Sequence, residues 1–202
     1  MGARRVFLLS PAHTGGRRAE ILLAPRADFP LARQLRAPGG APLGDVMAFL
    51  SGLYFRGKLA YARHFAADAR DVLVITAGAG LLAPEARVTP ARLRAFARCE
   101  IDAANPRFRE PLVADARTLG PCEAVLLGSI ASDKYVTPLL EVFGDRLLFP
   151  PDFVGRGDMS RGGLLLRRVG EARALELGPV RDAVRRGARA PKLAPRPPGT
   201  PR

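Results

Sequence analysis

Short runs of apolar, often β-branched residues recur along this chain, separated by much longer amphipathic stretches. The runs span residues 6–10, 72–76, 124–127 and 147–149. A strand buried on both faces has this continuous apolar character, and parallel strands need long crossover connections, which the intervening stretches supply. We therefore expect an α/β fold with an open, mostly parallel sheet, helices on both faces, and the four strands side by side.

Apolar residues at helical spacing occupy most of the connections. Gly52 and Gly57 interrupt the first such stretch, so one broken helix or two are expected there. Pro138 would kink a helix in another stretch. Helices are expected over residues 43–65, 92–101, 108–119 and 134–143, and a last helix or strand over residues 164–169.

The length of 202 residues suits one domain over residues 1–178. Residues 179–202 form a basic extension rich in Pro and Arg, whose composition predicts disorder from about residue 188. No apolar run approaches the roughly 20 residues of a membrane span, and the run after Arg4-Arg5 is too short for an export signal. We expect no membrane association and a cytoplasmic location.

The charge balance is strongly basic, with 32 Lys and Arg against 19 Asp and Glu and a formal net charge of +13. Such an excess indicates an anionic partner: nucleic acid (tRNA or DNA) or a nucleotide. Composition bias toward Arg is the alternative explanation. The residues leave the oligomeric state open. Two cysteines and two histidines, without ligand-type spacing, indicate neither a disulfide framework nor a metal site, and no cofactor motif is present.

The loops after the four predicted strands share small residues, hydroxyls and arginines. In open parallel sheets the ligand crevice lies beyond the carboxyl ends of the strands, and these residue types suit phosphate or another anion. Neither a phosphate-loop nor a dinucleotide-binding signature is complete. The substrate-binding residues predicted in these loops are Ser10, Thr14, Thr76, Gly78, Gly80, Ser129, Tyr135, Arg156 and Arg161.

Four residues in the same loops are candidates for catalytic proton transfer: His13, Asp133, Asp152 and Asp158. Each also has a structural alternative. His13 would then face solvent, Asp133 would cap a helix, Asp152 would shape a turn, and Asp158 would pair with a neighbouring arginine.

An aromatic and basic cluster lies in the first helical stretch. Tyr54 or Phe55 would stack on a base, and Arg56 and Lys58 would hold its phosphate. In the alternative, Tyr54 belongs to the core and Arg56 is a solvated charge.

The layout of residues 53–62, of residues 76–84 after the second strand, and of Gly128-Ser129 before Tyr135 resembles small bacterial YaaA-like domains of unknown function. It is more faintly similar to the central domain of archaeosine synthase, which acts in modifying a deazaguanine base in transfer RNA. Both resemblances imply an α/β domain linked to nucleic-acid or nucleobase chemistry. Where those domains carry a lysine after the first strand, this chain has Arg17-Arg18.

Three hypotheses follow. The first is a protein that modifies a nucleobase or nucleic acid, binding base and phosphate at the strand ends. The second is a non-catalytic nucleic-acid-binding module, and the third a binder of a small anionic nucleotide, so enzymatic activity stays open at this point. A deep pocket joining His13, Thr76, Ser129 and Asp158 would favour the enzyme, and a flat arginine-lined face would favour the module.

Overall fold

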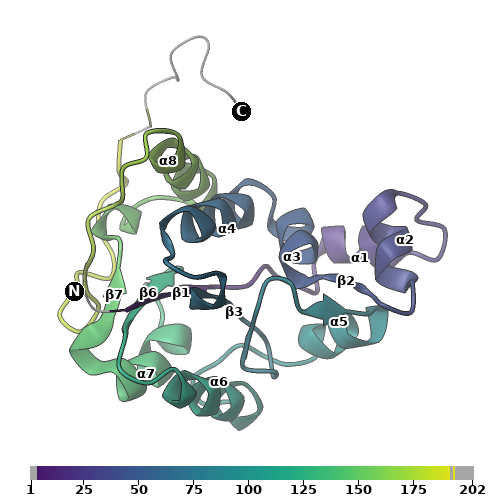
Figure 1. The fold of residues 1–202 in the computed structure, drawn as a ribbon, viewed down its shortest axis with the longest axis horizontal. Helices are drawn as coiled ribbons and strands as arrows, with labels where there is room; N and C mark the ends of the chain where they lie inside the picture. Colours follow the sequence, from purple (N-terminus) through teal and green to yellow (C-terminus); the bar gives the residue numbers. More distant parts are fainter. Residues whose placement is uncertain (1–3, 192, 194–202) are drawn as a thin grey trace.

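A six-stranded sheet forms the centre of the molecule in a computed structural model that describes residues 4–191 and 193 (Figure 1). The strand order is β4-β3-β1-β6-β7-β8. The four inner strands are mutually parallel, as predicted, and the two-residue edge strands β4 and β8 are antiparallel to their neighbours. The strands are β1 (Arg5–Leu9), β3 (Val72–Ile75), β4 (Leu81–Leu82), β6 (Glu123–Leu127), β7 (Leu147–Phe149) and β8 (Gly178–Pro179), with a separate pair β2 (Ala41–Pro42) and β5 (Arg87–Val88).

Helices occupy every long connection between the inner strands. They are α1 (Arg17–Leu23), α2 (Pro30–Arg36), α3 (Leu43–Ser51), α4 (Leu53–Phe65), α5 (Pro90–Ala97), α6 (Pro106–Thr118) and α7 (Asp133–Phe143), and a further helix, α8 (Asp158–Gly170), follows the last inner strand. Of the two glycines expected to break the first helical stretch, only Gly52 does so. Its φ of +66° lies in the left-handed region and separates α3 from α4, whereas Gly57 continues α4.

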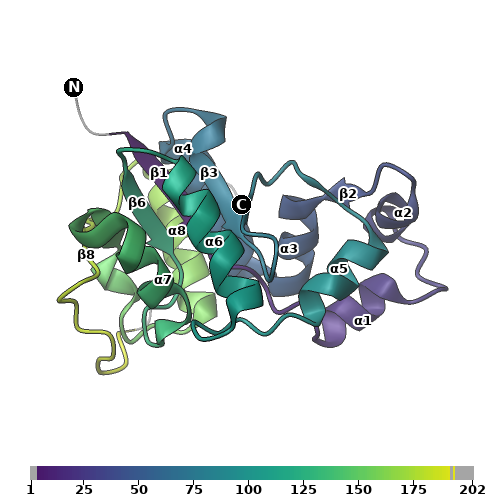
Figure 2. The same ribbon diagram turned by 90° about the horizontal axis from the view of Figure 1, so that it is seen from below.

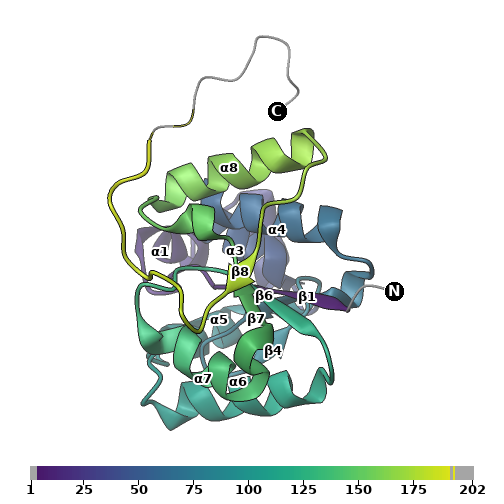
Figure 3. The same cartoon turned by 90° about the vertical axis from the view of Figure 1, so that its left-hand side faces the viewer.

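Alternate residues of each inner strand face two different hydrophobic clusters. In β1, Phe7 and Leu9 pack with α3, α4 and α8, whereas Val6 and Leu8 pack with α6 and α7. Figure 3 shows these helices above and below the sheet. The molecule is therefore a three-layer α/β fold, and burial on both faces explains the continuous apolar runs of the sequence.

Helices α4 and α8 pack unusually closely. A Cβ atom added at Gly57 would lie 2.7 Å from the carbonyl oxygen of Gly162, and one added at Gly162 would lie 2.7 Å from that of Leu53. The two backbones thus touch where each helix lacks a side chain. Just beyond α8, the Leu175 N–H donates to the buried Tyr61 hydroxyl at 2.8 Å and ties the following chain to α4.

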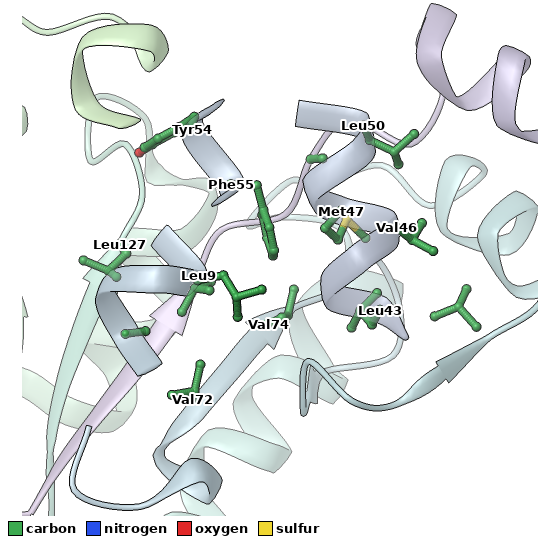
Figure 4. Close-up of a cluster of buried hydrophobic side chains, with 14 of the residues drawn as sticks. Leu9, Leu43, Val46, Met47, Leu50, Tyr54, Phe55, Val72, Val74 and Leu127 are labelled. Carbon is green, nitrogen blue, oxygen red and sulfur yellow. The ribbon is translucent and has the colours of Figure 1, made fainter. Parts of the chain in front are cut away.

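Successive residues of α4 serve different parts of the core. Figure 4 shows Phe55 pointing toward Leu9, Val74 and Met47, while Tyr54 points another way. The ring of Tyr54 lies 6.3 Å from that of Phe153, so it packs toward the start of α8. Tyr54 is 5% exposed and therefore belongs to the core, which was the alternative to its stacking on a base.

The first part of the basic extension packs on the domain. Val180 is fully buried and donates its N–H to the Leu147 carbonyl, and the Ala190 N–H donates to the Gly155 carbonyl at 3.1 Å. The predicted disorder from about residue 188 falls mostly on residues 192 and 194–202, which lie outside the described residues. None of the described helices has the length and apolar character needed to cross a membrane.

Candidate functional site

The topology fixes one crevice in the sheet. The chain leaves β1 and passes to β3 on one side of it, whereas β6 and β7 continue on the other side. The loops that follow β1 and β6 therefore diverge at their carboxyl ends, and open α/β sheets bind ligands in the crevice so formed.

A cavity of about 430 Å³ lies at this crevice. Figure 2 shows the loop after β1, the start of α7 and the end of α5 near the same edge of the sheet, where the parallel strands end. The volume falls in the range that suits a nucleoside-sized ligand. The cavity is lined by Pro11, Ala12, His13, Thr14, Gly15, Phe96, Ala97, Cys99, Glu100, Ile101, Lys134, Tyr135 and Asp158.

A lysine is completely buried beside this cavity. Lys58 is 1% exposed, and its ammonium group donates to the Ser10 carbonyl oxygen at 2.5 Å and to the Ser10 hydroxyl at 2.9 Å. Its Nζ also lies 4.3 Å from the centre of the Tyr54 ring. Lys58 thus fixes the carboxyl end of β1, directly before the loop that lines the cavity.

The surroundings of Lys58 disfavour its charge. Burial lowers the pKa of Lys58 to about 7, the Asp158 carboxylate opposes this shift, and the Arg161 guanidinium adds to it. Near neutral pH, the lysine therefore exchanges between its charged and neutral forms. Such a shift in a cleft is typical of functional sites, although structural networks produce it too.

Tyr54 and Arg161 connect this lysine to the cavity wall. The Arg161 guanidinium lies 6.0 Å from the centre of the Tyr54 ring and 3.5 Å from the Asp158 carboxylate, which lines the cavity. The buried Tyr54 hydroxyl has no hydrogen-bond partner in the described part of the chain. Burial raises the pKa of Tyr54, and the Arg161 charge partly offsets the rise, so the tyrosine stays protonated.

Tyr135 supplies an aromatic wall of the cavity. It is 4% exposed, packs edge-on against Phe108 with ring centres 6.2 Å apart, and lies 5.1 Å from the Lys134 ammonium group. Burial raises its pKa. The ring is thus a neutral surface next to a cation.

The structure brings together about half of the predicted site residues. His13, Thr14, Tyr135 and Asp158 line the cavity, and a buried layer beside it holds Ser10, Tyr54, Lys58 and Arg161.

Other predicted residues lie outside this site and have structural contacts. The Thr76 hydroxyl donates to the Gly80 carbonyl at 2.9 Å, which closes a tight turn, and the Ser129 hydroxyl accepts the Ala131 N–H. Asp133 forms an ion pair with Arg185. Neither Thr76 nor Ser129 lines the cavity, so the four-residue pocket expected from sequence forms only around His13 and Asp158. Arg156 donates to the carbonyls of Asp152 and Pro191 and belongs to the packing of the C-terminal segment.

The expected pairing of Arg56 with Lys58 on one phosphate does not occur. Residues two apart on a helix point in nearly opposite directions. Lys58 accordingly turns toward β1, whereas Arg56 is exposed and lines a separate groove of about 610 Å³ beside α8. Leu53, Ala60 and Leu166 also line that groove, which is mainly apolar and shares no lining residue with the cavity at the strand ends.

Several cavity residues carried no recognisable signal in the sequence. Phe96, Cys99, Glu100 and Ile101 end α5 or follow it, far from any inner strand along the chain. They reach the cavity because α5 lies beside the loop after β1. Lys134 also lines the cavity, and its position in the loop after a predicted strand, next to the expected helix cap Asp133, did indicate a place near the site.

Residues 4–191 and 193 contain no group of three or more His, Cys, Asp or Glu side chains that could hold a metal ion. Both cysteines are free thiols, with Cys99 partly exposed and Cys122 buried. Comparisons with protein-family models, with curated proteins and with solved structures find no match to this chain. The resemblance to YaaA-like domains and to archaeosine synthase stays a prediction.

Proposed function

We propose that this protein binds a nucleobase and its phosphate at the carboxyl ends of the parallel strands, with the base in the cavity beyond β1 and β6, and modifies the base there. The observation that carries the proposal is the convergence of His13, Tyr135 and Asp158 on one concave site at the point where the strand order reverses. The net charge of +13 favours an anionic ligand.

The cavity has the groups that a base needs. The exposed ring of His13 offers a stacking surface, which tolerates any base because every base has a π-face, and the buried rings of Phe96 and Tyr135 form part of the cavity wall. The carboxylates of Asp158 and Glu100 accept hydrogen bonds from the amino or imino edge of a base. Lys134 adds a cation to the wall of this cavity.

Proton transfer is assigned to Asp158, with His13 as the second candidate. The Asp158 side chain is 70% exposed, so a ligand has access to it, while the Arg161 guanidinium behind it fixes its position. Asp133 is removed from the catalytic candidates because it lies outside the cavity and pairs with Arg185.

The test combines binding with a search for product. Wild-type protein is titrated with nucleosides, mononucleotides, transfer RNA and DNA, and the nucleic acids are then examined by mass spectrometry for altered bases. Asp158→Asn preserves shape and removes the proton acceptor, so we expect turnover to be lost with affinity changed less than threefold. The Asp158 carboxylate is 70% exposed in its ion pair with Arg161, so this pair contributes little to stability and the fold should persist.

Two matched variants serve as controls. Asp152→Asn makes the same substitution at an exposed residue outside the cavity, and Arg56→Ala removes a cation from the separate groove beside α8. Both should retain wild-type turnover and affinity. If Asp158→Asn retains turnover as well, the assignment is wrong. If no altered base forms although nucleic acid binds, the protein is the non-catalytic module.

A further inference from the structure

A second, smaller cavity adjoins the first at the carboxyl end of β3. It has a volume of about 260 Å³ and is lined by Ala77, Gly78, Ala79, Arg92, Ala95, Phe96, Cys99 and Arg107. Phe96 and Cys99 line both cavities. The two spaces are therefore neighbours along one edge of the sheet, separated by a shared wall.

Two arginines give this cavity its charge. Arg92 comes from α5 and Arg107 from the first turn of α6, and both side chains are exposed. Within the described residues, neither guanidinium forms an ion pair with a carboxylate. That of Arg92 lies 5.9 Å from the centre of the Phe96 ring. In the part of the chain that the structure describes, no acidic residue lines this cavity, in contrast to the base cavity with Glu100 and Asp158.

The loop after β3 forms another wall of this cavity and leaves room for a ligand next to the two arginines. Ala77, Gly78 and Ala79 follow β3 with at most a methyl group each. Gly78 has a φ of +85°, and a Cβ there would lie 3.1 Å from the Cys99 sulfur. The loop thus passes close to the shared wall where a larger side chain would be strained and crowded.

We propose that this cavity is a phosphate subsite: Arg92 and Arg107 bind a phosphate attached to the base held in the neighbouring cavity. Two guanidinium groups facing a space without carboxylates match the charge and hydrogen-bonding geometry of phosphate oxygens. This inference rests on the proposed function and deepens it, because it assigns the phosphate of the bound nucleotide, free or within a strand, to Arg92 and Arg107.

The experiment compares ligands that differ only in phosphate. Affinities are measured by calorimetry for a nucleoside, its 5′-monophosphate, a trinucleotide of the same base, and inorganic pyrophosphate. Wild-type protein should bind the monophosphate at least tenfold more tightly than the nucleoside. The double variant Arg92→Ala/Arg107→Ala should lose that ratio and its pyrophosphate binding, with nucleoside affinity unchanged.

A second double variant, Arg94→Ala/Arg98→Ala, is the matched control. It removes the same charge from exposed residues of α5 and its C-cap that line neither cavity, so the phosphate preference should survive. Equal losses in both double variants would reduce the effect to general charge and overturn the subsite. A trinucleotide that binds more tightly than the monophosphate identifies a strand as the natural source of the phosphate, and the reverse identifies a free nucleotide.

The outcome separates the two proposals. If no nucleoside, nucleotide or trinucleotide binds and no base is altered, the proposed function fails. The subsite then stands only if pyrophosphate still binds and requires Arg92 and Arg107. If nucleoside and monophosphate bind with equal affinity, the subsite fails while the base cavity stands.

Discussion

Lys58 shows most clearly how position along a helix decides the role of a side chain. Sequence reasoning placed it on a phosphate beside Arg56, but the helix turns it into the interior, where it holds the end of β1. The error came from treating neighbours in sequence as neighbours in space. A lysine between apolar residues at helical spacing is the signal that would have predicted its burial.

The lowered pKa of Lys58 has a consequence for stability. The folded protein binds this proton with a pKa of about 7, against 10.5 for an unshifted lysine. Between those values the unfolded chain holds more protons, so stability rises with pH, by at most about 1.4 kcal/mol per pH unit. We expect chemical denaturation to show this rise from pH 7 to 9. Lys58→Met should abolish it, and Lys134→Met, at the cavity rim, should retain it. Parallel curves for wild type and Lys58→Met would contradict the assignment.

Cys99 offers a direct probe of the wall between the two cavities. It is partly exposed and lines both, whereas Cys122 is 2% exposed and burial raises the pKa of its thiol. Alkylation with iodoacetamide should therefore modify Cys99 alone in the folded protein, because only an accessible thiolate reacts. A nucleotide filling both cavities should slow that reaction severalfold, as followed by mass spectrometry of the intact chain. Equal labelling of both cysteines would contradict the burial of Cys122.

At the level of elements, the contact between α4 and α8 leaves no room for a side chain. Gly57→Ala would place a Cβ against the carbonyl of Gly162, which is backbone and moves only with its helix. We expect the free energy of unfolding to fall by about 1–3 kcal/mol, the usual cost of overpacking. Gly170→Ala is the matched control, because nothing lies within 4 Å of a Cβ there. It should be neutral or slightly stabilising in the same urea titration. Equal stability of the two variants would show that the helices can separate at little cost.

The inner strands were predictable because each is a continuous apolar run buried on both faces. The edge strands β4 and β8 were not, since pairs of residues such as Leu81–Leu82 carry no periodicity. Helices α1 and α2 were not predicted, because each has only seven residues and two of those are arginines. Among the site residues, those directly after β1 were predictable from topology. The contribution of α5 depends on tertiary packing that no local pattern records.

For the whole molecule, charge decides how binding responds to salt. A chain with a net charge of +13 should bind nucleic acid with an affinity that falls steeply as salt rises, because each neutralised phosphate releases counterions. Removing residues 194–202 deletes Arg196 and Arg202. The slope of log K against log salt should shrink by at most about 2, measured by fluorescence anisotropy.

The truncated chain for this experiment should end at Leu193, because Pro191 and Leu193 contact the folded domain. The Pro191 carbonyl accepts a hydrogen bond from Arg156, and the Leu193 side chain packs against the core. A chain ending at Leu193 should melt at the wild-type temperature, whereas one ending at Ala190 should melt several degrees lower. Identical melting of both truncated chains would show that these two contacts contribute nothing to stability.

The packing of α4 against α8 also determines when α4 can be buried during synthesis on the ribosome. The two helices are separated by about a hundred residues of sequence, yet the backbone of each packs against a glycine of the other, Gly57 in α4 and Gly162 in α8. A nascent chain that has emerged only through β7 leaves Tyr54 and its neighbours on α4 uncovered, and exposed apolar surface of this kind is what chaperones bind. Lys58 then remains in contact with water and keeps its charge. Its pKa falls to about 7 only in the complete fold, where the side chain is buried and Asp158 and Arg161 of α8 lie near it.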